Sequence, residues 1–427
     1  MTLAIVAAGV VRERSACIAQ FQRRRVKYVA SLNDEALPET TDPDIELLYI
    51  DIGNVDSEGR IHEVATYRFG AAPSRARRRV RHGDVIISCV RTYLQAIAHI
   101  EDPPANLIVS TGFAVVRPRD GVLESAFCKY VLREPAFLHE VIARSVGVSY
   151  PAINAMDLAN LDIPVPSLDQ QRGIASFLDR ETGRLDALLA AKERLLELLA
   201  EKRRALITRA VTRGLDPAVP LRGSGIPWLD RIPRHWETRR VAFAFRERDE
   251  RGEPDLPLLE VSINAGVVQR EFSDDRIENV AADFNTYKVA RAGDIVFNKM
   301  RMWQGAVGAA SCDGLVSPDY TVACPLGVLD SGYAESLFRT ALFSAECARH
   351  SHGIVWDRLR LYWEGFRDIR IPVPPLVEQR AIVAWLTRET GKLDALRVAA
   401  ERTIGLLRER RAALIAAAVT GQLAVGS

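Results

Sequence analysis

The amino-acid sequence predicts an α+β protein built as a pseudo-two-fold tandem repeat. Two homologous mixed α/β domains are expected, joined by two long antiparallel coiled-coil helices. Residues 163–215 and 371–423 align without a gap at an offset of 208, and about thirty of their 53 positions are identical, which indicates internal duplication. Short apolar runs between turn residues precede each copy and predict strands. Leucines at alternating steps of four and three within each copy predict the helices.

Length and composition limit the possible class. The chain has 427 residues, enough for two or three domains, and its apolar and charged fractions are those of a globular protein. Its six cysteines form no C-x-x-C pair, which favours free thiols in a reducing cytoplasm. Residues 1–11 are apolar but lack a preceding basic segment and are too short to cross a membrane. We therefore expect a cytoplasmic protein without a membrane partner.

The order of the strand-like and helical patterns along the sequence predicts six parts of the chain. The first domain shows strand-like runs and then helical spacing over 127–144, interrupted at Pro135; the second repeats this order with different residues. The expected parts are an N-terminal extension at 1–22, the first domain at 23–166, the first spacer helix at 167–214, a linker at 215–238, the second domain at 239–374 and the second spacer helix at 375–421.

Each spacer helix carries an apolar stripe. Ser167 and Gln170 have the spacing of a capping box, and Gly183 is expected to separate a short helix from a long one at 182–213. One such stripe alone would be unfavourable in water, so the two copies are expected to pair antiparallel within the chain. The seam residues are Leu185, Leu189, Leu196, Leu199 and Leu206 in the first copy, and Leu393, Ile404, Leu407 and Leu414 in the second.

Residues for catalysis are not recognisable. Asp102-Pro103-Pro104-Ala105 resembles the tetrapeptide of adenine methyltransferases, but Ala105 has no ring to stack a flipped base. No G-x-G-x-x-G follows a strand. Cys347, His350 and His352 have weakly metal-like spacing without a fourth ligand, so a surface or core role is the better interpretation. We expect no catalytic, cofactor-binding or metal-binding residues, and no enzyme activity in this chain.

Two local patterns are typical of DNA binding, although the net charge is only +2. Arginines cluster at 75–81, where they could contact phosphates. The segment 298–304 follows a buried strand and offers side chains suited to base edges, and Arg91 matches Arg301 in register. The candidate DNA-binding residues are Arg75, Arg77, Arg78, Arg79, Arg91, Tyr93, Asn298, Lys299, Arg301, Trp303 and Gln304. The alternatives are a solvated arginine turn and core positions for Tyr93 and Trp303.

The repeated pattern Ile-Pro-x-Pro-x-Leu-x-x-Gln-x-x-Ile, followed each time by a long helix, resembles the specificity subunit of type I restriction-modification systems. The segments 225–236, 293–301 and 315–320 extend the resemblance. It implies two target-recognition domains that each read half of a bipartite DNA target, separated by paired spacer helices. It also implies double-stranded DNA, two methyltransferase subunits and a motor-nuclease restriction subunit as partners. S-adenosylmethionine, ATP and Mg²⁺ would then belong to the partner subunits.

One departure and one alternative accompany this interpretation. The pattern Gly-x-x-Trp-Leu-x-x-Ile-Pro-x-His-Trp precedes the second domain at 225–236, and the family has it before the first domain as well. Residues 1–22 lack it, and only Arg25–Tyr28 resemble its continuation. The alternative function is a coiled-coil adaptor that tethers two protein-binding domains without DNA, which the near-neutral charge also permits.

Overall fold

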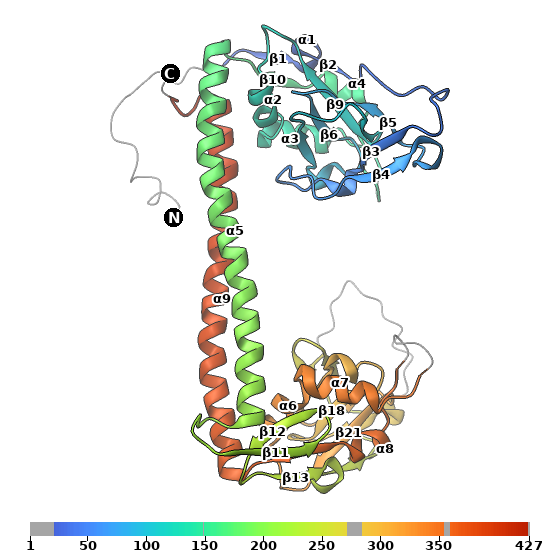
Figure 1. Ribbon diagram of the computed structural model, residues 1–427, viewed down its shortest axis with the longest axis vertical. Helices are drawn as coiled ribbons and strands as arrows, with labels where there is room; N and C mark the ends of the chain where they lie inside the picture. Colours follow the sequence, from blue (N-terminus) through green and yellow to red (C-terminus); the bar gives the residue numbers. More distant parts are fainter. Residues whose placement is uncertain (1–20, 148, 271–283, 354–358, 426–427) are drawn as a thin grey trace. The chain divides into compact units, whose positions relative to one another are not determined.

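The computed structural model describes residues 21–147, 149–270, 284–353 and 359–425 (Figure 1). The N-terminal extension expected at 1–22 therefore lies almost wholly outside the described residues. The chain divides into two compact units. Unit 1 takes residues up to 193 together with residues from 402 onward, and unit 2 takes residues 194–401. Each unit thus combines one α/β domain with part of both long helices.

Unit 1 contains two four-stranded sheets. The first is antiparallel throughout and has the order β2-β9-β6-β7; the second has the order β4-β3-β8-β5, with β3 and β8 parallel. The strands of the first sheet are β2 (Ala30–Leu32), β9 (Phe113–Pro118), β6 (Val85–Ser88) and β7 (Ile97–His99). Those of the second are β4 (Ala65–Arg68), β3 (Glu46–Ile50), β8 (Leu107–Ser110) and β5 (Ala76–Arg79).

The central strand β6 is buried on both faces. Val85 and Ile87 pack in a cluster with Phe127 and Val131 of the helices, whereas Ile86 packs in a cluster with Val109 of the second sheet. A strand that is covered on both faces typically has a continuous run of apolar residues, and residues 85–87 form such a run. The covering helices are α2 (Ser125–Val131), α3 (Pro135–Ala143) and α4 (Ala155–Ala159). The interruption expected at Pro135 is the start of α3, where proline occupies the first turn.

Unit 2 repeats this arrangement. Its antiparallel sheet has the order β14-β21-β18-β19, equivalent to β2-β9-β6-β7. The strands are β14 (Phe245–Arg248), β21 (Tyr320–Pro325), β18 (Ile295–Asn298) and β19 (Val307–Ala309), and the covering helices are α6 (Ser331–Phe338), α7 (Ala341–Arg349) and α8 (Trp363–Asp368). Further pairs are β15 (Leu259–Ser262) with β16 (Gly266–Gln269), and β17 (Lys288–Ala290) with β20 (Gly314–Val316). The prediction of two homologous mixed α/β domains is confirmed.

A short antiparallel pair in each unit joins the start of the domain to the chain just before a long helix. The pairs are β1 (Arg23–Arg25) with β10 (Asp162–Pro164), and β13 (Glu237–Arg240) with β22 (Arg370–Val373). In unit 2 the expected linker 215–238 also forms a hairpin of β11 (Leu221–Ile226) and β12 (Leu229–Pro233). Trp236, which follows it, is fully buried and donates from Nε1 to Glu378 Oε2 at 3.0 Å.

The long helices are α5 (Leu168–Arg213, 46 residues) and α9 (Leu376–Val419, 44 residues). Ser167 and Gln170 form the predicted capping box, with Gln170 N 3.4 Å from Ser167 Oγ and Ser167 N 3.1 Å from Gln170 Oε1. The predicted break at Gly183 is wrong, because α5 continues through it. One glycine inside a helix costs only about 1 kcal/mol relative to alanine. Burial of the neighbouring Thr182 and Leu185 can offset that cost.

Within each unit the two helices pair antiparallel. In unit 1 Arg411 Nε lies 2.9 Å from Asp186 Oδ1, and in unit 2 Arg203 lies 2.6 Å from Asp394 Oδ1. These are the same Asp–Arg pair in both units, because Asp394 and Arg411 are the counterparts of Asp186 and Arg203 at the offset of 208. None of the nine expected seam residues is exposed: Leu185, Leu189, Leu199, Leu393 and Ile404 are buried, and Leu196, Leu206, Leu407 and Leu414 are partly buried.

A buried glutamine ties each long helix to its own domain. Gln171 Oε1 accepts from Glu124 N at 2.8 Å, and Nε2 donates to Val122 O at 3.0 Å and Pro166 O at 2.8 Å. The equivalent Gln379 makes the same three bonds, to Asp330 N at 2.7 Å, Val328 O at 3.1 Å and Pro374 O at 2.8 Å. Both side chains are fully buried. A neutral amide supplies the acceptor and the two donors that these backbone groups need.

We predict that Gln171→Ala or Gln379→Ala lowers the free energy of unfolding by about 2–4 kcal/mol. Each change removes three hydrogen bonds and leaves buried backbone groups unsatisfied. Urea unfolding of the full chain measures the loss. Asp169→Ala, an exposed neighbour on α5, is the control and should change stability by less than about 0.5 kcal/mol. Equal effects of the glutamine and control variants would contradict a structural role for the buried amides.

Candidate nucleic-acid interface

An irregular turn follows the central strand of each domain. In unit 1 it is η4 (Thr92–Leu94), and in unit 2 it is η7 (Met302–Gln304). Arg91 and Gln95, which flank η4, both have left-handed backbones, with φ of 54° and 53°. Such conformations are unfavourable for residues with a Cβ and persist only where the surroundings enforce them. In unit 2 a glycine, Gly305 with φ 87°, takes the position after the turn.

Ser145, Pro151 and Ile153 hold the strained turn of unit 1 in place. Arg91 N donates to Pro151 O at 2.8 Å, and Ile153 N donates to Cys89 O at 2.9 Å. The hydroxyls of Thr92 and Ser145 are 2.8 Å apart. The backbone before η4 therefore pairs with a segment about sixty residues later. This pairing fixes the direction in which the side chains of the turn project.

One partly buried guanidinium and two exposed aromatic side chains mark this turn. Arg91 lies over the ring of Tyr150, with its Cζ 4.7 Å from the ring centroid. Tyr93 is 52% exposed and Tyr150 is 61% exposed. A core position for Tyr93 is thereby excluded. Stacking on the ring restricts the guanidinium while leaving its N–H groups available for a ligand.

In unit 2 the candidate residues of the turn divide into two groups. Asn298 and Lys299 help to hold the turn: Asn298 Oδ1 accepts from Met300 N at 2.9 Å, and Lys299 Nζ donates to Pro318 O at 3.4 Å. Trp303 is partly buried and donates from Nε1 to Met300 O at 3.0 Å. Arg301 and Gln304 are exposed. The exposed pair offers one guanidinium and one amide for contacts with a ligand.

The arginine run is a strand rather than a solvated turn. Ala76–Arg79 form β5, at the edge of the second sheet. Arg75 and Arg79 are exposed, whereas Arg77 lies over the Phe69 ring at 4.6 Å. Arg78 is half-buried, burial lowers its pKa, and its buried Nε has no described hydrogen-bond partner. The run therefore contributes two solvent-facing cations, at Arg75 and Arg79.

Two neighbouring arginines, Arg81 and Arg117, belong to a network of ion pairs within the fold. Arg117 binds the buried Asp84 through Nε and Nη2, both at 2.8 Å, and Glu35 at 2.6 Å; Glu35 in turn binds Arg81 at 2.6 Å. The hydrogen bond from Arg117 lowers the pKa of Glu35. Unit 2 has the same order of charges: Asp294, Arg248, Glu250 and Arg291. Arg81 and Arg291 are thus neutralised within the fold.

The candidate cations have no such partners, in contrast to Arg81 and Arg117. No described carboxylate lies within ion-pair distance of any of the seven. These are Arg75, Arg77, Arg78, Arg79, Arg91, Lys299 and Arg301. Tyr150 is the residue that sequence reasoning missed. The only local signal for Tyr150 in the sequence was its position beside Pro151 in a turn. Its contact with Arg91 arises only in the folded chain.

The remaining sequence features give no further site. Cys347 is fully buried, and burial raises the pKa of its thiol well above the usual range. Over the described residues, no group of three or more His, Cys, Asp or Glu side chains is placed to hold a metal ion. Asp102 of the Asp-Pro-Pro-Ala segment pairs with His82 at 3.1 Å on the surface. Among the same residues, no helix is both long and apolar enough to cross a membrane.

Comparison with solved structures extends the description of the fold. A chain from a study of the structural basis of complex assembly and conformational transition of the type I R-M system has a TM-score of 0.72 and 22% identity, covering 95% of this chain and 98% of that one. The HsdS subunit from Thermoanaerobacter tengcongensis has a TM-score of 0.51 and 23% identity, covering 95% and 97%. At these identities the similarity establishes a shared fold.

Comparison of sequences points to the same group of proteins. A putative type I restriction enzyme MjaX specificity subunit of Methanocaldococcus jannaschii is 25% identical over 166 residues, 38% of this chain and 37% of that protein. The type I restriction enzyme HindI specificity subunit of Haemophilus influenzae is 22% identical over 135 residues, 31% and 29%. The chain thus spans about a third of the length of these curated relatives. Residues 77–198 match the family model of the type I restriction modification DNA specificity domain, and the resemblance of the chain to type I specificity subunits is confirmed.

Proposed function

We propose that this chain is the DNA-recognition subunit of a type I restriction-modification complex, without catalytic activity of its own. Each domain recognises one half of a bipartite double-stranded target. One observation carries the proposal: the turn after the central strand recurs in both domains but exposes different side chains. The first turn exposes Tyr93, Leu94 and Gln95 beside the partly buried Arg91, and the second exposes Arg301 and Gln304 beside the partly buried Trp303. Two homologous domains that expose different side chains at the same turn are suited to recognising two different half-sites.

The chemistry of each turn matches base-edge recognition. An arginine can donate two hydrogen bonds to guanine, and a glutamine can pair with adenine in the major groove. Tyr150 restricts Arg91 by stacking, which reduces the entropy lost when the guanidinium binds. Arg75 and Arg79 are suited to phosphates, which fix register without reading sequence. Under this proposal, the two kinds of arginine have separable effects on specificity and on affinity.

The long helices support binding of two copies of one partner. Unit 1 exposes Leu188 and Leu406, and unit 2 exposes Leu198 and Leu396, each between 45% and 56%. Leu188 and Leu396 are counterparts at the offset of 208, as are Leu198 and Leu406. Exposed leucines on a helix surface favour protein contacts. Two identical methyltransferase subunits would find equivalent surfaces here, a motor-nuclease subunit would join them for restriction, and S-adenosylmethionine, ATP and Mg²⁺ would act in those partners.

The salt dependence of DNA binding tests the proposal against the protein-tethering adaptor. We predict that binding of the chain to duplex DNA weakens steeply with salt, because phosphate contacts release counterions. Arg75→Ala and Arg79→Ala should each reduce the slope of log K against log salt by about 1 and weaken binding to all sequences alike. Glu39→Ala, an exposed control of opposite charge, should not reduce the slope. An adaptor would show neither DNA binding nor a slope.

Substitutions in the reading turns test base recognition. We predict that Arg91→Ala and Arg301→Ala each cost about 1–3 kcal/mol of binding to the cognate target and relax specificity at one half-site. Tyr150→Phe keeps the ring under Arg91 and should retain specificity, whereas Tyr150→Ala should lose part of it. Tyr28→Ala, at a similarly exposed tyrosine, is the control. Competition binding with single base-pair changes measures the effect; uniform losses across all sequences would assign these residues to phosphate contacts instead.

A further inference from the structure

The turn after the central strand of unit 1 and the segment paired with it expose four large apolar side chains. Tyr93 and Leu94 are 52% and 47% exposed, and Val146 and Tyr150 are 80% and 61% exposed. Single exposed apolar residues are ordinary, but these four gather on two backbone segments that both pair with Ala152. Over the described residues, Leu94 joins none of the buried apolar clusters of the fold. A ligand contact is therefore the better explanation for this leucine.

The backbone around Leu94 is constrained. Leu94 N donates to Arg91 O at 2.8 Å. Gln95 N donates to Thr92 O at 3.1 Å, which closes the turn. Thr92 is buried, and its hydroxyl lies 2.8 Å from that of Ser145. Because this backbone is already ordered, a contact through Leu94 loses little conformational entropy on binding.

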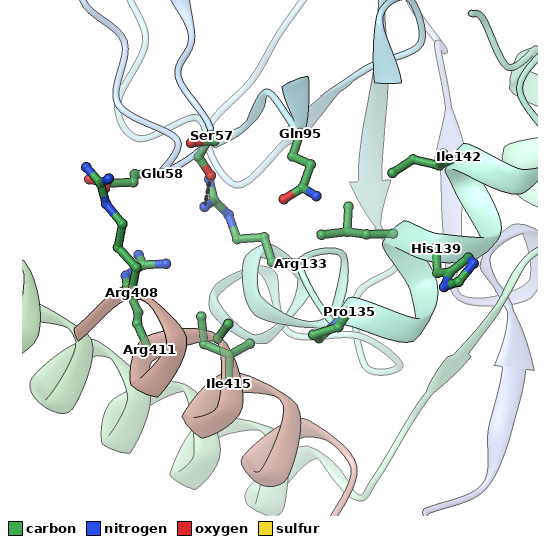
Figure 2. Close-up of a pocket in the computed structure, with 12 residues that line it drawn as sticks. Ser57, Glu58, Gln95, Arg133, Pro135, His139, Ile142, Arg408, Arg411 and Ile415 are labelled. Carbon is green, nitrogen blue, oxygen red and sulfur yellow. Dashed lines mark hydrogen bonds and ion pairs between the residues drawn. The ribbon is translucent and has the colours of Figure 1, made fainter. Parts of the chain in front are cut away.

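The residue after the turn is directed toward α3. Figure 2 shows the side chain of Gln95 pointing into a cavity of about 730 Å³ that Arg133 and Ile142 also line. Leu94 does not line this cavity. The side chains left exposed beside Arg91 are therefore a phenol and an isobutyl group, and the isobutyl group offers no hydrogen bond.

The same position in unit 2 carries a polar side chain. Leu94 and Gln304 are counterparts at an offset of 210, the offset that also relates Arg91 to Arg301. Each is the last residue of its turn, and each is exposed. Under the proposed function Gln304 contacts a base edge, so its counterpart also faces a base. Between the two domains an amide at this position is exchanged for an isobutyl group.

An apolar side chain that faces bases in the major groove can recognise one of them. Guanine, adenine and cytosine present hydrogen-bond donors and acceptors there, whereas thymine also presents its C5-methyl group. Contact with that methyl group removes apolar surface of both partners from water. Against the other bases, the isobutyl group of Leu94 would displace water from polar groups without replacing the hydrogen bonds. Leucine at this position therefore favours thymine.

The composition of the two paired segments favours DNA over a protein as the ligand. Residues 88–95 and 145–153 contain no Asp or Glu. No described carboxylate lies within ion-pair distance of Arg91, the cation of the first segment. A surface of this kind meets phosphates without repulsion between like charges.

We propose that Leu94 recognises the C5-methyl group of a thymine in the half-site of unit 1. The inference rests on the proposed function, and it adds a residue and the base that this residue selects. Arg91 and Leu94 are three residues apart in one 3₁₀ turn, a rise of about 6 Å. Base pairs follow one another at about 3.4 Å. The thymine is therefore expected within about two base pairs of the guanine that Arg91 contacts.

Replacing thymine by uracil tests the proposal, because this change removes the methyl group alone. The target is first selected from a pool of random duplexes with the full chain and its co-expressed methyltransferase subunit. Each thymine of the selected target is then replaced in turn. At one thymine, uracil should weaken binding about fourfold, the factor for one buried methyl-sized group. Leu94→Ala should bind the thymine and uracil duplexes equally, and Leu94→Met, which remains apolar, should retain the discrimination.

Leu326→Ala is the matched control, because Leu326 is 48% exposed and lies outside both turns. This variant should keep the affinity and the fourfold discrimination of the unaltered chain. Thermal unfolding should give the same midpoint for Leu94→Ala as for the unaltered chain; a lowered midpoint would assign the leucine to the fold and overturn the proposal. Loss of the methyltransferase subunit from Leu94→Ala would place the leucine in a protein contact and would also overturn it.

The DNA measurements separate this inference from the proposed function. Equal binding of the thymine and uracil duplexes by the unaltered chain would overturn the inference and leave DNA recognition intact. A fourfold discrimination that persists in Leu94→Ala, or a selected target without thymine, would have the same meaning. Absence of salt-dependent binding to any duplex would overturn the proposed function together with the inference.

Discussion

The buried amides of Gln171 and Gln379 are the contact on which the arrangement of each unit depends. Each amide binds the backbone just before its own long helix and the loop that leads into a domain helix. The angle at which the helix leaves the domain is therefore fixed by the same three hydrogen bonds in both units. This explains why the glutamine lies in the segment that the duplication left almost unchanged. Divergence elsewhere in the domain leaves the frame intact.

The ion pairs around the buried Asp84 and Asp294 show how far the domains have diverged around that frame. Asp84 and Asp294 occupy the same turn and each holds an arginine, yet Arg117 belongs to β9 and Arg248 to β14. β14 is the equivalent of β2, and β2 pairs with β9 in the sheet of unit 1. The position of the guanidinium was retained while the strand that supplies it changed. The constraint acts on the charge at the buried turn, and the exposed turns after β6 and β18 lie outside it.

The sequence predicted the repeat, both long helices, the central strands and the two candidate turns, because each leaves a local pattern of apolar spacing. It placed a break at Gly183, where helical contacts outweigh the cost of one glycine. Features that depend on distant partners were missed. Arg81 belongs to the arginine run in sequence, but Glu35 neutralises it in the fold. Tyr150 likewise gains its role only when its segment pairs with the turn before η4.

The central claim is that each domain reads one half of a DNA target. Replacing residues 239–370 with the corresponding segment of a divergent specificity subunit, and mapping methylated adenines in DNA after co-expression with the methyltransferase subunit, tests it most directly. One half of the methylated sequence is expected to change, while the other half is retained. A change in both halves, or in neither, would contradict it.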